Sequence, residues 1–302
     1  MKFQFIEDFQ DEFSVVRMCE VLEVSRSGYY NWLKMKQKEL TENQLYRQKV
    51  RQKIFQFFHE SFGTYGAPRI HKDLVANGYF VSEKTVGRYM SEMGLRAIPS
   101  EPFMITTDSN HSQPIFENLL HQDFETNQPN EVWVTDMTYV WTWEGWIYLA
   151  AILDLYSRKV VGWHIADHMR TEVPIRALKM AVDLRKPGKG LIHHSDRGSQ
   201  YASKEYRKAL EAFEAVGSMS RTGNPYDNAC SESFFATLKK ELVYRKQFKT
   251  KAEAIQTINW YISAFYNEKR RHSSNNYLSP NQYERQQPKI VLEATIPSLQ
   301  SV

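Results

Sequence analysis

Three acidic residues, Asp136, Asp196 and Glu232, have the chemistry and the local settings of metal ligands. Asp136 interrupts an apolar, β-branched run over 132–140, and Asp196 follows a second such run over 190–195, which predicts a buried strand at each. Glu232 falls in the opening turn of a predicted helix. A carboxylate in an apolar strand is costly unless something pairs with it. Three carboxylates from three elements are typical of a site for hard divalent cations.

The elements that must hold these residues can be read from the hydrophobic periodicity. Strands are expected at 131–141, 146–154 and 159–166, in an antiparallel meander. The elements expected after them are a helix at 171–184, the Asp196 strand, a helix at 203–213, a strand near 215–220, the Glu232 helix and a helix at 251–267. This order is typical of an α/β ribonuclease H-like core, a mixed five-stranded sheet with flanking helices.

The N-terminal third of the chain predicts only helices. Two short helices are expected over 14–37 and an amphipathic helix over 41–58. The residues of the longer helix expected to face inward are Leu45, Val50, Ile54 and Phe57. Pro68 opens another helix that ends at Gly78, and Ser82 caps the next. This all-α pattern is that of a helix-turn-helix motif, whose second helix can enter a major groove, and an ordinary helical hairpin shares it.

Charge is unevenly distributed along the chain, although the net charge is only +4. Residues 34–96 hold 12 Lys and Arg against 6 Asp and Glu, and residues 237–302 hold 11 against 5. Residues 97–127 hold 5 Asp and Glu and no Lys or Arg, and their Pro, Ser and Thr predict an interdomain linker. One basic run is usually a solvated helix face. Two basic segments around a metal-type site favour nucleic acid as the partner.

Composition argues against a membrane or secreted protein. No apolar run reaches the roughly 20 residues that cross a bilayer, so no membrane partner is expected. The N-terminus lacks the apolar segment of a signal peptide. Cys19 and Cys230 are too few and too far apart for a disulfide framework or a zinc knuckle, so we expect no zinc. These features predict a cytoplasmic, reduced location.

Five ordered motifs lie between residues 133 and 280, and the resemblance that they carry covers about residues 60–285. They are Trp133-x-x-Asp136-x-Thr138-Tyr139, then Leu153-Asp154-x-x-Ser157-Arg158-x-x-Val161-Gly162-Trp163, then His194-Ser195-Asp196-x-Gly198-x-Gln200-Tyr201, then Asn224-Pro225-Tyr226-Asp227-Asn228-Ala229-x-x-Glu232, and finally Tyr266-Asn267-x-x-Arg270-x-His272 followed by Leu278-Ser279-Pro280. Together they resemble the DDE transposases of bacterial insertion sequences, of the second-reading-frame (OrfB) type, which are close to retroviral integrases.

The resemblance implies an enzyme that binds the ends of an insertion sequence and catalyses metal-dependent cleavage and strand transfer of DNA. It implies that Asp136 bridges two Mg²⁺ or Mn²⁺ ions, with Asp196 on one ion and Glu232 on the other. The implied partners are double-stranded DNA at the transposon ends and the target, further copies of this chain in a homo-oligomer, and an upstream reading-frame product. The candidate DNA contacts are Lys239, Arg69, Lys84 and Arg88.

Composition and resemblance together predict the domain organisation. The expected parts are a short helix-turn-helix-like segment at 1–38, a helix-turn-helix DNA-binding domain at 39–96, the linker at 97–127, a ribonuclease H-like integrase core at 128–287 and a tail at 288–302. Two other functions stay open. One is a ribonuclease H-type nuclease, which would be expected to use an additional carboxylate. The other is a DNA-binding regulator whose catalytic core has decayed, which the loss of any of the three acids would have favoured.

Four residues near the acidic trio have competing roles. Asp154 is interpreted as a turn acid that pairs with Arg158, and Asp227 or Asn228 as the cap of the Glu232 helix. Period-2 alternation places His194 on the same strand face as Asp196, either to orient a ligand or as a packing residue. Lys239 lies seven residues after Glu232 on one helix edge, where a DNA contact and plain solvent exposure are equal alternatives.

Overall fold

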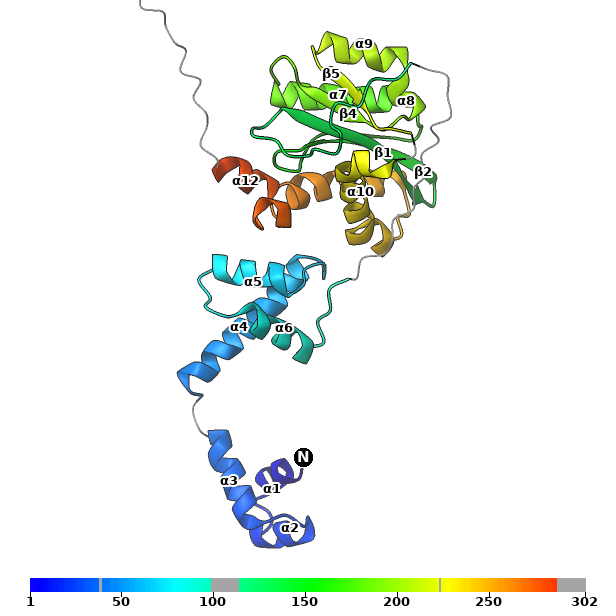
Figure 1. Cartoon of the computed structure of the whole chain (residues 1–302). Coiled ribbons are helices and arrows are strands. Elements are labelled where there is room, and N and C mark those ends of the chain that lie inside the picture. Colours follow the sequence, from blue (N-terminus) through cyan, green and yellow to red (C-terminus); the bar gives the residue numbers. More distant parts are fainter. Residues whose placement is uncertain (38–39, 99–113, 223, 287–302) are drawn as a thin grey trace, which may run out of the picture.

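The computed structural model describes residues 1–37, 40–98, 114–222 and 224–286 (Figure 1). The first three helices are α1 (Lys2–Asp8), α2 (Val15–Val21) and α3 (Arg26–Gln37). They pack around Ile6, Cys19 and Tyr29, which are almost completely buried. The two helices expected over 14–37 are therefore confirmed, and α1 is an addition that the periodicity did not predict.

The next three helices form the helix-turn-helix unit. They are α4 (Glu42–Glu60), α5 (Ala67–Ala76) and α6 (Glu83–Glu92), as expected. The hydroxyl of Thr41 accepts a hydrogen bond from Gln44 N at the start of α4, and the hydroxyl of Ser82 accepts one from Thr85 N at the start of α6. The inward position expected for Leu45 is wrong, because its side chain is exposed. The apolar core shared with α5 and α6 begins only at Val50.

The core is built on one mixed sheet with the strand order β3-β2-β1-β4-β5. Its strands are β1 (Val132–Thr142), β2 (Gly145–Asp154), β3 (Lys159–Ala166), β4 (Ile192–Ser195) and β5 (Val216–Met219). The first three form the expected antiparallel meander, and β4 and β5 run parallel to β1. This is the mixed five-stranded sheet of a ribonuclease H-like core, so the predicted fold class is confirmed.

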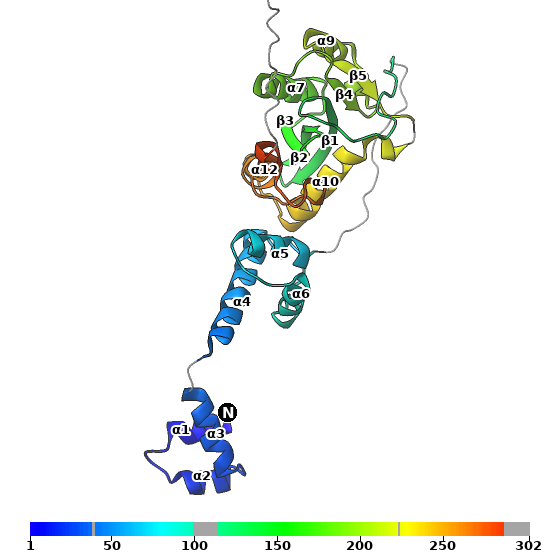
Figure 2. The same ribbon diagram turned by 60° about the vertical axis from the view of Figure 1, so that its left-hand side comes forward.

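Helices cover both faces of the sheet (Figure 2). They are α7 (Glu172–Arg185), α8 (Ser199–Ala202), α9 (Lys204–Ala212), α10 (Ala229–Glu241), α11 (Lys251–Trp260) and α12 (Pro280–Gln286). One apolar cluster joins the sheet to α7 and α9, and a second joins its other face to α10 and α11. The helix expected over 251–267 continues beyond α11 as a π-helical turn, Tyr261–Tyr266.

Gly162 allows α7 to lie directly on strand β3. A Cβ atom at this position would stand 2.3 Å from the carbonyl oxygen of Ala177 and 2.7 Å from the Cβ of Ala181. Both neighbours belong to α7, one of them through its backbone, so neither can move aside cheaply. The Gly162 of the second sequence motif is therefore a packing residue.

The described part of the segment expected to be a linker, 114–127, packs on the core. Phe116 joins the α7–α9 cluster, and Leu120 is buried in the cluster under α10 and α11. Asn118 is also buried, and its side-chain amide donates to Asp227 Oδ2 at 2.9 Å. The linker-like composition of this segment did not predict these contacts, because they are made by a few separated residues and not by a continuous apolar run. The rest of that segment and the tail expected at 288–302 lie outside the described residues.

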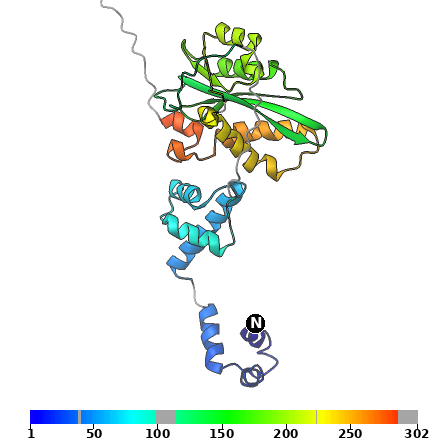
Figure 3. The ribbon, with the colours of Figure 1, turned by 45° about the vertical axis from the view of Figure 1, so that its right-hand side comes forward.

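The helix-turn-helix unit contacts the core through α5 (Figure 3). Arg271 Nε donates to Asp73 Oδ1 at 2.6 Å, and the Arg271 backbone N donates to the hydroxyl of Tyr65 at 2.7 Å. The ring of Phe62, between α4 and α5, also packs edge-on against those of Trp260 and Phe265. The contact is thus both polar and apolar and joins residues about two hundred positions apart. Among the helices that the structure describes, none combines the length and apolar composition needed to cross a bilayer.

Candidate active site

Strand register brings Asp136 and Asp196 next to each other. Strands β1 and β4 pair in parallel up to Thr135 and Ser195, so the two aspartates are the next residues along adjacent strands. Asp136 lies on the face of β1 that also carries Val134 and Val140, which pack under α10. Glu232 lies in the first turn of α10. The three residues therefore come from a central strand, a strand end and a helix start, as expected.

The charges of the trio act on one another. Burial raises the pKa of Asp136 well above its ordinary value, and the charges of Asp196 and Glu232 raise it further. Burial also raises the pKa of Glu232, and the charge of Asp196 adds to this effect. The three carboxylates thus share one electrostatic environment. In residues 1–37, 40–98, 114–222 and 224–286, no three His, Cys, Asp or Glu side chains are grouped tightly enough to hold a metal ion as they stand.

Local hydrogen bonds orient the site residues. Asp136 Oδ1 accepts from the backbone N of Met137 at 2.7 Å, and Asp196 Oδ1 accepts from the backbone N of Gly198 at 2.9 Å. The side-chain amide of Asn228 donates to the carbonyl oxygen of Thr135 at 3.2 Å. That bond ties the start of α10 to the β1 residue just before Asp136. It sets where Glu232 enters the site.

His194 is buried in the interior, where its ring nitrogens face two serine hydroxyls. Its Nδ1 lies 2.8 Å from the hydroxyl of Ser218, and its Nε2 lies 3.1 Å from the hydroxyl of Ser220. Burial lowers the pKa of His194 to about 4, so the ring is neutral at neutral pH. Of the two roles left open by the sequence, the structure favours the packing histidine.

The interpretation of Asp154 as the partner of Arg158 is wrong. Asp154 is fully buried, and its Oδ2 accepts from Arg185 Nη2 at 2.9 Å and from the backbone N of Asn130 at 2.9 Å. Arg158 has a left-handed backbone with a φ of 60°, and its Nη1 lies 2.8 Å from Cys230 Sγ. The turn therefore directs Arg158 towards Cys230 on α10. Asp154 pairs instead with Arg185 on α7.

Neither Asp227 nor Asn228 caps the Glu232 helix through its side chain. The short 3₁₀ turn Pro225–Asn228 before α10 is capped by Asn224, whose Oδ1 accepts from Tyr226 N at 3.1 Å. Asp227 is fully buried and accepts five hydrogen bonds, from Asn118, Gln122 and three nitrogens of Arg221. Hydrogen bonds from Arg221 hold the pKa of Asp227 well below its usual range. Asp227 is therefore a structural acid, which links the start of α10 to Arg221 and to the segment that contains Asn118 and Gln122.

We expect Asp227→Asn to lower the free energy of unfolding by at least about 2 kcal/mol, because a fully buried carboxylate that accepts five hydrogen bonds is lost. Urea unfolding followed by circular dichroism measures this change. Asp167→Asn is a matched control, because Asp167 is largely exposed, and it should change the free energy by less than about 0.5 kcal/mol. Equal effects for the two variants would contradict the structural role of Asp227.

Lys239 lies beside the acidic trio. Its Nζ stands 5.3 Å from the ring centroid of Tyr139 on strand β1. Burial lowers the pKa of Lys239, and the charge of Asp136 raises it. The charges of Lys239 and Asp136 therefore interact. This agrees with the predicted position of Lys239 on the same helix edge as Glu232, two turns further along. A contact with DNA remains a prediction for this residue.

The three basic residues predicted in the helix-turn-helix unit fall in two places. Lys84 and Arg88 are exposed on α6, four residues apart on one helix face. Arg69 instead faces the core, with Nη1 3.9 Å from Glu241 Oε1 and its guanidinium over the ring of Tyr65. The structure therefore keeps Lys84 and Arg88 together and separates Arg69 from them.

A buried ion pair between Arg270 and Glu241 holds the C-terminal end of α10. The sequence pattern did not predict this pair. Arg270 donates to both carboxylate oxygens of Glu241, with the shortest distance 2.8 Å, and both side chains are almost fully buried. The hydroxyl of Tyr261 also donates to Glu241 Oε2 at 2.7 Å. The motif Tyr266-Asn267-x-x-Arg270-x-His272 was the available signal. Its Asn267 bonds the backbone N and O of Val160, so the motif fastens the C-terminal helices to the sheet.

Known families match most of the described chain. The Integrase core domain family matches residues 126–225 and, in a second form, 217–280, and the HTH-like domain family matches residues 46–103. A structure of the HTLV-2 integrase catalytic core domain in complex with magnesium is similar with 16% identity and a TM-score of 0.41, over 54% of this chain and 100% of that chain.

Two relatives are similar over nearly their whole length. The Transposase InsF for insertion sequence IS3A of Escherichia coli (strain K12) is 43% identical over 284 residues, which is 94% of this chain and 98% of that protein. An insertion element IS600 protein of 31 kDa from Shigella sonnei is 43% identical over 263 residues, which is 87% of this chain and 96% of that protein. The matched length includes the helix-turn-helix unit and the whole acidic trio. The chain therefore belongs to the DDE transposases of the IS3 family.

Proposed function

We propose that this transposase cuts and joins DNA at the carboxylates of Asp136, Asp196 and Glu232, with two divalent ions, Mg²⁺ or Mn²⁺, held between them and the DNA. The observation that carries the proposal is the β1–β4 register, which makes Asp136 and Asp196 neighbours just beyond the paired segment. The donor set fits such ions, because it consists of carboxylate oxygens whose mutual repulsion a cation would relieve.

Strand transfer requires a 3′-hydroxyl to attack a phosphorus atom in line with the leaving oxygen. When bound, two divalent ions would activate the attacking oxygen and stabilise the leaving one. Asp136, Asp196 and Glu232 would hold these ions through their carboxylate oxygens, and Asp136, which interacts with the charges of both other acids, lies on the central strand of the sheet. The hydrogen bonds from Met137 N and Gly198 N orient two of these carboxylates. No residue forms a covalent bond to DNA in this scheme.

DNA-end recognition is assigned to the helix-turn-helix unit at 39–96. The exposed pair Lys84 and Arg88 on α6 supports this assignment, since clustered cations on the second helix can contact phosphates. Arg69 is assigned to the contact with the core instead. We further propose that the protein acts at the nucleoid as a homo-oligomer on DNA, with an upstream reading-frame product supplying further DNA-binding parts.

A strand-transfer assay tests the proposal. Purified protein is incubated with duplexes that carry the terminal repeats of the element and with a plasmid target. We expect joined products with Mg²⁺ or Mn²⁺ and none with a chelator, while end binding in a gel-shift assay persists without metal. Joining that continues in the chelator, or a covalent protein–DNA product, would contradict the proposed chemistry.

Lys239→Ala is expected to lower joining by about tenfold, because a phosphate contact beside the trio positions the strand. Lys240→Ala is the matched control. It lies one residue on, about 100° around the helix, and should change joining by less than about twofold. Both variants are compared in single-turnover assays at saturating Mg²⁺. A damaging Lys240→Ala with a silent Lys239→Ala would show that the other helix face meets DNA.

A further inference from the structure

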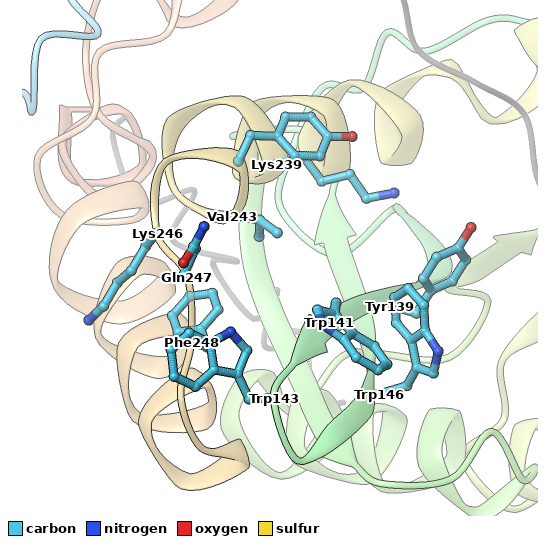
Figure 4. Close-up of a pocket in the computed structure, with 10 residues that line it drawn as sticks. Tyr139, Trp141, Trp143, Trp146, Lys239, Val243, Lys246, Gln247 and Phe248 are labelled. Atoms are coloured by element: carbon cyan, nitrogen blue, oxygen red, sulfur yellow. The ribbon is translucent and has the colours of Figure 1, made fainter.

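The β1–β2 hairpin extends well beyond the parallel part of the sheet. Strand β4 pairs with β1 only over Val132 to Thr135, whereas β1 continues to Thr142. The far end of β1 is joined to the segment after α10 through the bridge between Thr142 and Phe248. Between the hairpin and that segment lies a hollow of about 470 Å³ (Figure 4).

Exposed aromatic rings line one side of this hollow. Tyr139, Trp141 and Trp146 come together there, with 38%, 53% and 43% of their surfaces exposed. The ring of Trp146 lies 5.0 Å from that of Tyr139 and 4.8 Å from that of Trp141, both in edge-on contacts. Register explains the grouping, because Trp141 and Trp146 are directly opposite each other across the hairpin. We call these three residues the aromatic shelf.

Cations flank the aromatic shelf. Lys239 Nζ lies over the Tyr139 ring, and Lys246 lies across the hollow, with its Nζ 5.6 Å from the Phe248 ring. Lys246 is paired with Glu253 at 3.0 Å. The other carboxylate near the hairpin, Glu144, accepts from the backbone N of Lys251 at 2.8 Å. Lys239 connects the shelf to the acidic trio, because its Nζ lies over the Tyr139 ring and its charge interacts with that of Asp136.

The shelf begins close to the proposed site of chemistry. Tyr139 is three residues from Asp136 along one strand, which corresponds to about 10 Å at about 3.3 Å per residue. By period-2 alternation the Tyr139 side chain lies on the opposite face of β1 from that of Asp136. Lys239 links the two, through its contact with the Tyr139 ring and its charge interaction with Asp136. A DNA strand that contacts Lys239 beside Asp136 therefore also lies close to the aromatic rings. The hollow is also lined by Lys239 and Lys246, whose charges complement the phosphates of a DNA strand. Aromatic rings beside cations therefore favour DNA over a protein partner as the occupant of the shelf.

We propose that the aromatic shelf binds unpaired bases of the DNA strand next to the scissile phosphate. This inference rests on the proposed function and adds a substrate preference to it. Aromatic rings stack on any base, and a neighbouring cation contacts the backbone, so such binding depends on strand opening more than on sequence. Opening the duplex beside the cleavage point exposes those bases, and the shelf stabilises the opened form.

The test uses the full chain and two end duplexes of equal sequence length. One is fully paired, and the other carries a short mismatched stretch beside the cleavage point, with 2-aminopurine at an unpaired position. We expect the protein to quench the 2-aminopurine fluorescence and to bind the mismatched duplex at least about fivefold more tightly. Trp141→Ala and Trp146→Ala should remove both effects, and Trp141→Phe should keep most of them.

Leu184→Ala is the control, because Leu184 is an apolar residue of α7 on the core with 60% of its surface exposed. It should leave both effects unchanged. Quenching is measured in Ca²⁺ or chelator, so it is independent of joining and separates this proposal from the failure of the metal chemistry. Unchanged quenching in the folded Trp141→Ala variant would overturn the proposal. So would an altered oligomeric state in light scattering with no effect on quenching, since it would mark a protein interface.

Discussion

Asp136→Asn, Asp196→Asn and Glu232→Gln should each reduce strand transfer by about a thousandfold or more, while end binding changes by less than about twofold. The amides keep the shape of the carboxylates but lose the charge that would hold divalent ions. Joining is measured with Mg²⁺ on pre-cleaved ends, and binding is measured by fluorescence anisotropy. A variant that joins at near wild-type rate would remove its residue from the proposed site.

Stability measurements make this prediction more specific. Because burial and the charges of its neighbours disfavour ionised Asp136, we expect Asp136→Asn to leave the metal-free melting temperature unchanged or higher. A structural acid behaves in the opposite way, as expected for Asp227→Asn. Asp183→Asn on the exposed side of α7 is the matched control and should leave joining, binding and melting unchanged.

Arg270→Met should lower the free energy of unfolding by about 3–5 kcal/mol, because it leaves the carboxylate of Glu241 buried without its main partner. The Arg270 guanidinium opposes the effect of burial and keeps the pKa of Glu241 below its ordinary value. The double variant Arg270→Met with Glu241→Gln should recover most of the loss, since no uncompensated charge then remains. Urea unfolding gives all three free energies.

The control for this pair is Arg285→Met. Arg285 forms an ion pair with Glu268, but 66% of its side chain is exposed, so the change should cost less than about 1 kcal/mol. Should Arg270→Met prove no more costly than Arg285→Met, the buried pair would not be what supports α10. A loss of joining in an Arg270 variant could then not be attributed to loss of the buried ion pair.

Much of the core could be predicted from the sequence because its signals are local. The three long strands alternate or run apolar over eight residues or more, and their bounds in the structure agree closely with the expected ones. Ser82 is a cap as predicted, and Pro68 opens α5. The positions of the acidic trio on two strands and a helix could be inferred from motifs whose flanking residues have strong preferences.

The remaining features depend on contacts between distant parts of the chain. Asp154 pairs with Arg185, which is 31 residues away on a helix, and a local turn partner was the only one that the sequence could suggest. The exposure of Trp141 arises because the apolar cluster on its face of β1 extends only as far as Met137. The position of Leu45 depends on where α5 and α6 cross α4. Such choices are made by tertiary packing, which outweighs local propensity.

The parallel pairing of β1 with β4 also sets an order of assembly during synthesis. Partners such as Val132 and Ile192 are 60 positions apart, and α10 follows β5 later still. A ribosome releases the helix-turn-helix unit first, the β1–β3 meander next and the Glu232 helix after both. On the proposed chemistry, a chain that stops before Glu232 can occupy transposon ends without cutting them. Truncated products would therefore compete with the full-length enzyme, and incomplete translation would dampen the mobility of the element.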